Sequence, residues 1–495
     1  MVENTLKQNE HLSVKETATY SLGSLAREIS NNSINVFFLA YLNIVMGLDA
    51  LVLTVAFVLA KLWDAVNDPI LATMINNTRD TKYGKFRPWI AIGAVLNAVS
   101  IVLLFLPIDA SEAWKYVYYI GMYVLWGMTF TILDVPFWSM IPTMANSTDE
   151  RNKVSSMAKL VGGFGGFTIS SIGTALILPM AISRNLGSPK AYFLIGITTA
   201  VLLLTFISAT VFGNKEKYSL PRENIGLKKI FGIFKENDQL GAYSIFYILF
   251  ISAITIALFQ VLYLFIYYGE LGIGLLRQDS YGIFIGVACT GQGIAMIFYT
   301  LLTKKIPREK IFGADYFMAI LGMTGLFFVF FLLGSNVWVN VILVALAGAF
   351  LMTASGLYQI GSTVMIADIV DYGEWKTGKR ADSIIFSVQT LLTKFAGAIA
   401  MLILGIGIKV AELPTIIDVP DPDTGQMIQT FTGTVTSSSL DILRAFMFLV
   451  PIPLCLIGYI VYKKKFTLYG ERYDQIKKDI EERRIENGID IYKSI

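Results

Sequence analysis

The sequence predicts an all-α polytopic membrane protein with twelve transmembrane helices. Of its 495 residues, 55% are hydrophobic and only 16% are charged, and the mean hydropathy is +0.60. A soluble globular domain of this length carries more charge than this. A bilayer core about 30 Å thick needs roughly 20 apolar residues per helical crossing, and such stretches recur along nearly the whole chain. Lipid is therefore the expected solvent of most of the surface.

The apolar stretches form two groups of six, separated by one long polar segment. The expected helices cover residues 19–46, 49–77, 89–108, 113–145, 154–182, 190–213, 240–269, 279–303, 312–334, 337–367, 383–410 and 438–463. The polar segment holds six basic residues and the helix breaker Pro221. We expect an N-terminal arm at 1–18, a bundle at 19–213, a linker at 214–238, a second bundle at 239–463 and a tail at 464–495.

Basic residues concentrate in alternate loops, which sets the expected orientation. Nineteen Lys and Arg residues fall in one set of loops and five in the other, and positive charge is retained on the cytoplasmic side. We therefore expect the arm, the linker, the tail and both termini to be cytoplasmic. The expected location of this multi-pass protein is a bacterial inner (plasma) membrane. Membrane lipid is the expected partner of the outer surface. No basic patch suited to nucleic acid is present.

Ionisable side chains inside the predicted helices are the clearest functional signal. Each costs at least about 2.5 to 3.5 kcal/mol at the bilayer centre, so each needs a partner, a water-filled cavity or a function. In KLWDAVNDP the intervals of three and four residues place Lys61, Asp64, Asn67 and Asp68 on one face of the second helix. Further polar residues lie in four other helices: Arg27 and Glu28 in the first, Thr131 and Asp134 in the fourth, Lys159 in the fifth and Lys394 in the eleventh.

Two interpretations of these charges are open. The N-terminal half holds an excess of carboxylates over basic groups inside its helices. Ion pairs that only hold helices together would not require such a surplus. The other interpretation is a cation site, because carboxylate, amide and hydroxyl oxygens are hard ligands suited to Na⁺, or to H⁺ if a carboxyl group is protonated.

Two further segments bear on function. IADIVDYGEWKTGKRAD carries Asp368, Asp371 and Arg380 at a membrane edge, where gating contacts compete with ordinary loop solvation. The run VGGFGGFTIS follows no strand and lacks a GKS or GKT ending, so close helix packing is favoured over nucleotide binding. Because no nucleophile–base pair and no phosphate-binding loop occur at bilayer depth, we expect neither an enzyme nor a cofactor other than a coupling cation.

Collinear motifs in both halves resemble the glycoside-pentoside-hexuronide:cation symporter family of the major facilitator superfamily, to which melibiose permease belongs. The motifs are KLWDAVNDPI followed by TKYGKFRPW, then LDVPFWSMIP, IADIVDYGEW and SVQTLLTK, and the resemblance runs from Tyr20 to Lys463. It implies the major facilitator fold of two six-helix bundles. It also implies uptake of a small-molecule sugar coupled to Na⁺, Li⁺ or H⁺ by alternating access.

The resemblance implies roles for the residues at matching positions. Na⁺ would bind Asp64, Asn67, Asp68 and Thr131, with the two aspartates as anionic ligands. The sugar would contact Arg27, Glu28, Asp134, Trp138, Lys159 and Lys394. A cytoplasmic gate would draw on Asp368, Asp371 and Arg380.

Departures from melibiose permease affect the expected substrate. Arg27-Glu28 replaces a Lys-Asp pair, and Lys159 replaces an arginine, which changes the geometry offered to sugar hydroxyls. A galactoside is therefore not favoured, while pentosides, glucosides and hexuronides stay open. The alternatives are an H⁺-coupled symporter, or a related carrier for a non-sugar amphiphile or anion.

Overall fold

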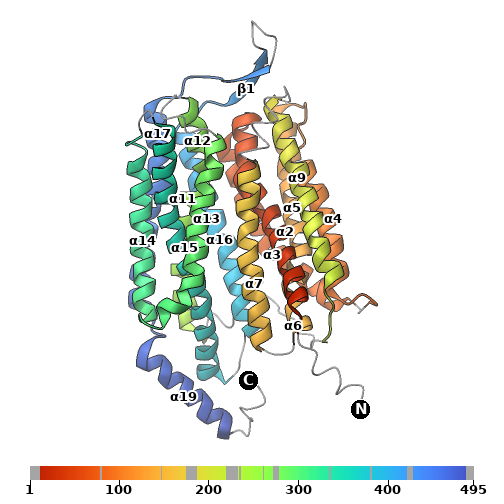
Figure 1. Ribbon diagram of the computed structural model, residues 1–495, viewed down its shortest axis with the longest axis vertical. Helices are drawn as coiled ribbons and strands as arrows, with labels where there is room; N and C mark the ends of the chain where they lie inside the picture. The colour runs from red at the N-terminus through yellow and green to blue at the C-terminus, as the bar shows by residue number, and fades with distance from the viewer. Residues whose placement is uncertain are drawn as a thin grey trace.

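Long helices lying side by side make up almost the whole molecule (Figure 1). The computed structural model describes residues 12–78, 81–145, 148–173, 187–218, 232, 236–259, 261–270, 278–333, 336–378, 382–420 and 427–486. Each of the twelve predicted helices has a counterpart in it, so the all-α prediction is confirmed. The predicted linker lies largely outside the described residues, as does Arg380.

The first six helices form one bundle. They are α2 (Val14–Ser33) continued by the π-helical η2 (Ile34–Phe38) and η3 (Tyr41–Val45), α3 (Ala50–Asn77), α4 (Phe86–Leu104), α5 (Glu112–Ser139) with the short α6 (Ile141–Met144), α7 (Thr148–Ile172) and α9 (Gly187–Gly213). Within this bundle α2 packs on α7 and α9, α4 packs on α5 and α9, and α3 packs on α5.

The other six helices form the second bundle. They are α11 (Asp238–Phe259) with α12 (Val261–Glu270), α13 (Gln278–Thr303), α14 (Arg308–Val329), α15 (Val337–Thr377), α16 (Asp382–Val410), and α17 (Ser437–Arg444) continued by η5 (Ala445–Leu449) and α18 (Pro451–Lys465). Here α15 packs on α13 and α14, and α11 packs on α16 and α18. The two bundles meet where α3 contacts α16 and where α7 contacts α13.

Three of the helices that carry predicted site residues are too polar to be recognised as membrane spans by hydropathy. Nine helices in the described ranges are long and apolar enough to cross a membrane. α2, α3 and α7 are not among them, and these three supply Arg27, Asp68 and Lys159. The polarity that weakens their hydrophobic signal is thus the polarity of the predicted site. Both α3 and α4 expose apolar side chains, such as Leu59 and Val95, as helices that contact lipid should.

Several helix ends are fixed by side chains that satisfy free backbone groups. Ser13 and Glu16 form a reciprocal capping box at the start of α2. The Glu216 carboxylate accepts hydrogen bonds from the backbone N–H of Phe86 (2.7 Å) and of Arg87 (3.0 Å) at the start of α4. Gly378, with φ of 71°, ends α15 in the left-handed conformation that glycine adopts without strain.

Two features were not predicted. α15 runs to Thr377, ten residues beyond the expected end at 367, because its polar last turns continue past the apolar span. Strands β1 (Ile416–Pro420) and β2 (Met427–Phe431) pair antiparallel between α16 and α17. This hairpin lies at one end of the molecule, and helix α19 (Gly470–Glu486), within the predicted tail, lies at the other (Figure 1). We call these the hairpin end and the α19 end.

The bundles are joined directly at the hairpin end. Lys409 of α16 forms an ion pair with Asp49, which caps α3. The Tyr263 hydroxyl donates to the Asn43 side-chain oxygen across the bundles (3.4 Å). Gly405 packs against the side chain of Thr54, and the hairpin packs against α9 and η3. This end of the interface is therefore closed.

We predict that Gly405→Val opens the hairpin end. A Cβ at Gly405 would collide with Thr54, whereas a Cβ at Gly397 on the same helix would meet no atom within 4 Å. Gly397→Val is therefore the matched control. The measurement is maleimide labelling of Asn43→Cys from the hairpin side, which should become faster in Gly405→Val and stay unchanged in Gly397→Val. Equal labelling in both variants would contradict the closure described here.

Candidate functional site

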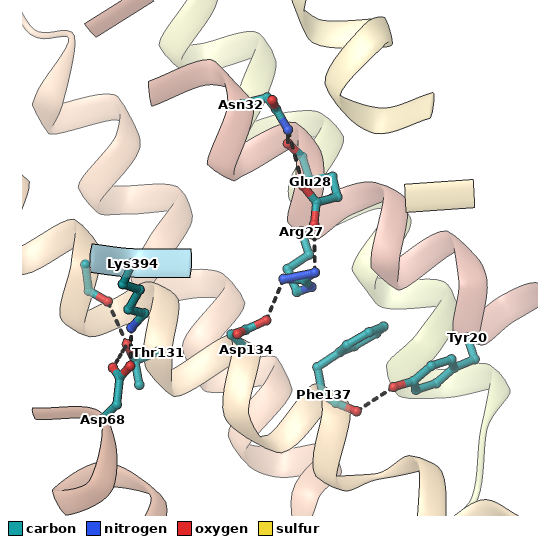
Figure 2. A network of polar contacts seen from close by, with 10 residues as sticks. Tyr20, Arg27, Glu28, Asn32, Asp68, Thr131, Asp134, Phe137 and Lys394 are labelled. Carbon is teal, nitrogen blue, oxygen red and sulfur yellow. Dashed lines mark hydrogen bonds and ion pairs between the residues drawn. The ribbon is translucent and has the colours of Figure 1, made fainter. Parts of the chain in front are cut away.

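Asp68 lies at the interface between the bundles, where α3 contacts α16. Its Oδ1 accepts a hydrogen bond from the Thr131 hydroxyl of α5 (2.8 Å), and its Oδ2 forms an ion pair with the Lys394 ammonium of α16 (Figure 2). Both carboxylate oxygens are therefore engaged, one by each bundle. Lys394 was predicted to face the interior, but its partner lies 326 residues away in the chain and could not be predicted.

Asp64 and Asn67 lie beside Asp68 on the same face of α3. Both are buried. Asp64 Oδ2 is 3.7 Å from Lys61 Nζ, and the carboxylate packs so closely on α5 that a Cβ added to Gly127 would lie 2.8 Å from Oδ1. The four oxygen-bearing residues predicted to bind the cation, Asp64, Asn67, Asp68 and Thr131, thus come from two packed helices. Their donors are the hard oxygens that suit an alkali cation.

A second polar cluster surrounds Arg27 on α2. Its guanidinium donates to Asp134 Oδ1 (2.6 Å) and to Glu28 Oε1 (2.7 Å), and Asn32 donates to Glu28 Oε2 (3.2 Å) (Figure 2). Arg27 is buried, whereas the Glu28 and Asp134 side chains stay 27% and 22% exposed. Arg27 therefore orients two carboxylates that still reach open space.

Aromatic rings complete this cluster. The Arg27 guanidinium carbon lies 5.0 Å from the Trp138 ring centroid and 5.7 Å from that of Phe137. Trp138 is partly exposed, and Arg27 lies over its ring. A sugar ring that stacks on Trp138 would need the opposite face. Phe137 also holds the end of α5, because its carbonyl accepts a hydrogen bond from the Tyr20 hydroxyl (2.6 Å).

α5 joins the two clusters. Thr131 and Asp134 are three residues apart, so one helical turn separates a side chain that contacts Asp68 from one that contacts Arg27. Figure 2 shows the two clusters next to each other. The two clusters therefore contact a single helix within one turn of each other.

The remaining residue predicted to bind the sugar is Lys159. Lys159 is exposed on α7 and forms no ion pair with a described residue. It lies one turn before Gly162, where an added Cβ would be 3.2 Å from Glu28 Cγ. The glycine run thus brings α7 against α2, as its packing interpretation predicted.

The predicted gate residues contact the second bundle itself. Asp368 pairs with Arg308 (3.3 Å), and Asp371 Oδ2 accepts from the Tyr473 hydroxyl of α19 (2.9 Å). Burial, with hydrogen bonds to the Asp368 and Asp371 carboxylates, raises the pKa of the Tyr473 phenol, so that it remains a donor. Asp479 of α19 also accepts from the Trp375 indole N–H (2.9 Å). α19 is therefore attached to the gate segment of α15.

Sequence reasoning missed Tyr123 and Trp126 of α5. Lys61 Nζ lies 5.7 Å from the Tyr123 ring centroid and 5.3 Å from that of Trp126. Tyr123, Gly127 and Thr131 recur every four residues, which places them on one helix face. This spacing opposite the charges of the second helix was the signal that could have identified Tyr123.

The fold and the charged interface define a polytopic secondary transporter of the major facilitator type. The chain belongs to the MFS/sugar transport protein family, whose model matches residues 19–464. It is therefore a multi-pass membrane transporter and not an enzyme.

Individual relatives agree with this assignment. The chain is 23% identical to an uncharacterized symporter of Bacillus subtilis (strain 168), over 97% of this chain and 98% of that protein. It is 24% identical to a lactose permease of Lactobacillus helveticus (98% and 75%) and 25% identical to an isoprimeverose transporter of Lactiplantibacillus pentosus (80% and 81%).

Solved structures share the fold at low identity. A D-xylose-proton symporter aligns with a TM-score of 0.60 at 13% identity, over 90% of this chain and 97% of the other. The nucleoside transporter NupG aligns with the same score at 11% identity, over 91% and 100%. These likenesses confirm the major facilitator fold and carry no information on substrate.

We predict that Arg27→Gln destabilises the first bundle. The change leaves Asp134 and Glu28 without their shared cation, and breaking such a buried pair costs about 3 to 5 kcal/mol. Thermal unfolding of the detergent-purified protein should therefore begin at a lower temperature. The double variant Arg27→Gln/Asp134→Asn should recover part of the loss, because one unpaired carboxylate is removed. A single variant as stable as the wild type would show that the guanidinium does not neutralise these groups.

Proposed function

We propose that this protein is a Na⁺-coupled sugar symporter that works by alternating access across a bacterial plasma membrane, with both termini in the cytoplasm. The observation that carries the proposal is the position of Asp68, which contacts Thr131 of its own bundle and Lys394 of the other. A cation that binds Asp68 through both oxygens must displace the Lys394 ammonium. Cation binding would then alter a contact between the bundles.

A sugar is the substrate that the relatives and the side chains support. Relatives are named lactose permease, raffinose carrier protein and isoprimeverose transporter, all after saccharides. Asp134 and Glu28 offer carboxylate oxygens for hydroxyl groups, and hydrogen bonds to charged groups contribute about 1.5 to 3 kcal/mol each. Trp138 offers an aromatic face to the apolar side of the ring. Lys159, which has no ion pair with a described residue, offers a cationic donor on α7, one turn before the contact of Gly162 with Glu28.

Na⁺ is the coupling cation that the oxygen set favours. Two carboxylates, an amide and a hydroxyl form a shell of hard ligands, which a proton does not need. Proton coupling is the second candidate, because protonation of Asp68 would also release Lys394. The two differ in the ion whose gradient drives uptake.

Alternating access follows from the closed hairpin end. With the termini cytoplasmic, this end faces outward, so the structure corresponds to a state closed to the outside. Outward opening would separate Asp49 from Lys409 and move the hairpin away from α9. The gate at the α19 end would then involve Asp368, Asp371 and Arg380.

We predict Na⁺-driven accumulation in tight proteoliposomes. A potential of about 100 mV contributes roughly 2.3 kcal/mol per charge, and a tenfold Na⁺ gradient adds about 1.4 kcal/mol, enough for accumulation of several hundred-fold at one-to-one stoichiometry. The measurement is uptake of a panel of radiolabelled glycosides with a Na⁺ gradient or a pH gradient. Uptake that follows the pH gradient and ignores Na⁺ and Li⁺ would contradict Na⁺ coupling.

We also predict that Asp134 and Trp138 contribute to sugar binding in different ways. Asp134→Asn should weaken binding at least about tenfold even at saturating Na⁺, because it removes charge-assisted hydrogen bonds. Trp138→Ala should lose affinity without altering the dependence on the cation. Calorimetric titration of each folded variant with a transported sugar decides the matter. Near-normal affinity in Asp134→Asn would mean that Asp134 serves only its ion pair with Arg27.

A further inference from the structure

Three buried polar atoms beside Asp64 have no hydrogen-bond partner in the described part of the chain. They are the Tyr123 hydroxyl, the Trp126 indole Nε1 and the Asn67 amide Nδ2. Tyr123 is 2% exposed, Trp126 1% and Asn67 5%. Because buried polar groups are almost always hydrogen-bonded, to protein or to ordered water, such a group of unsatisfied atoms indicates a polar occupant.

The three residues lie around Lys61 and Asp64 of α3. Lys61 Nζ lies 3.7 Å from Asp64 and faces the rings of both Tyr123 and Trp126. Tyr123 lies within electrostatic reach of Asp64. Gly127, one turn after Tyr123, lets the carboxylate approach the α5 backbone. Asn67 follows Asp64 by one turn of α3.

The chemistry of these atoms identifies the occupant. An indole N–H and an amide N–H can only donate, so the occupant must accept hydrogen bonds, which a bare metal ion cannot do. The neighbouring Asp64 carboxylate, whose Oδ2 lies 3.7 Å from Lys61 Nζ, can accept a further hydrogen bond from the same occupant. A water molecule meets both conditions, because it can accept from the Trp126 indole N–H, donate to the Asp64 carboxylate and to the Tyr123 oxygen, and keep its second lone pair for a cation.

We propose that Tyr123 and Trp126 bind a water molecule that bridges to Asp64 and serves as a ligand of the coupling cation. This proposal rests on the proposed cation coupling. It makes Tyr123 a positioning residue, which acts on the cation through water and does not touch the sugar. The hydroxyl of Tyr123 sets the affinity for the cation, and Asp134 of the sugar cluster around Arg27 lies about three turns further along α5.

The test is Tyr123→Phe, which removes only the hydroxyl. Tyr118→Phe is the matched control, because Tyr118 lies on the same helix and its hydroxyl donates to the Leu103 carbonyl (2.9 Å), away from Asp64. Calorimetric titration of each purified variant gives its affinity for Na⁺ and its affinity for a transported sugar at saturating Na⁺. Tyr123→Phe should bind Na⁺ about three- to tenfold more weakly, the range expected for one lost hydrogen bond. Its sugar affinity and both affinities of Tyr118→Phe should stay within about twofold of the wild type.

Trp126→Phe provides a second variant, since it removes the indole N–H and keeps an aromatic ring. It should weaken Na⁺ binding in the same direction. If the wild type binds Na⁺ and Tyr123→Phe binds it equally tightly, the proposal of a bound water is contradicted. The proposed coupling to Na⁺ would still stand. A parallel loss of sugar affinity would also contradict the bound water, because it would indicate a general disturbance of α5. A wild type that does not bind Na⁺ would overturn the coupling, and this proposal with it.

Discussion

The ion pair between Asp68 and Lys394 is the interaction on which the rest of this interface depends. A charge inside a bilayer is costly unless an opposite charge neutralises it. Asp68 is neutralised by a lysine from the other bundle, and Asp64 has Lys61 close by on its own helix. Because one of these two lysines belongs to the opposite bundle, the charge balance of α3 is tied to the contact between bundles. Any ion or proton that neutralises Asp68 therefore changes the energy of that contact.

α5 extends this constraint to the second cluster. Its Thr131 contacts Asp68, and one turn later its Asp134 contacts Arg27. The Arg27 guanidinium is in turn fixed by Glu28 and by the ring of Trp138. A cation at Asp68 and a solute at Asp134 would thus act on the same helix turn. Reciprocal coupling between the two ligands is expected from such an arrangement, because each alters the environment in which the other binds.

Much of this could be predicted from the sequence, because bilayer thickness fixes the length of apolar spans and the cost of charge marks the exceptions. Asp68 and Lys394 were identified in this way, each on its own helix. Their pairing was not, since it joins residues far apart in the chain, as does the pair of Asp49 with Lys409. The last turns of α15 were missed because they are polar. The hairpin was missed because hydropathy does not distinguish a paired loop from an irregular one, although the segments IIDVP and MIQTF have strand-like composition.

The dependence of sugar affinity on Na⁺ tests the central claim most directly, when the purified wild type is compared with Asp68→Asn. If Asp68 ties the cation to the contact between bundles, the wild type should bind sugar more tightly as Na⁺ rises. Asp68→Asn should still bind sugar, but with an affinity that no longer depends on Na⁺. An Asp68→Asn variant that keeps the Na⁺ dependence of the wild type would contradict the account.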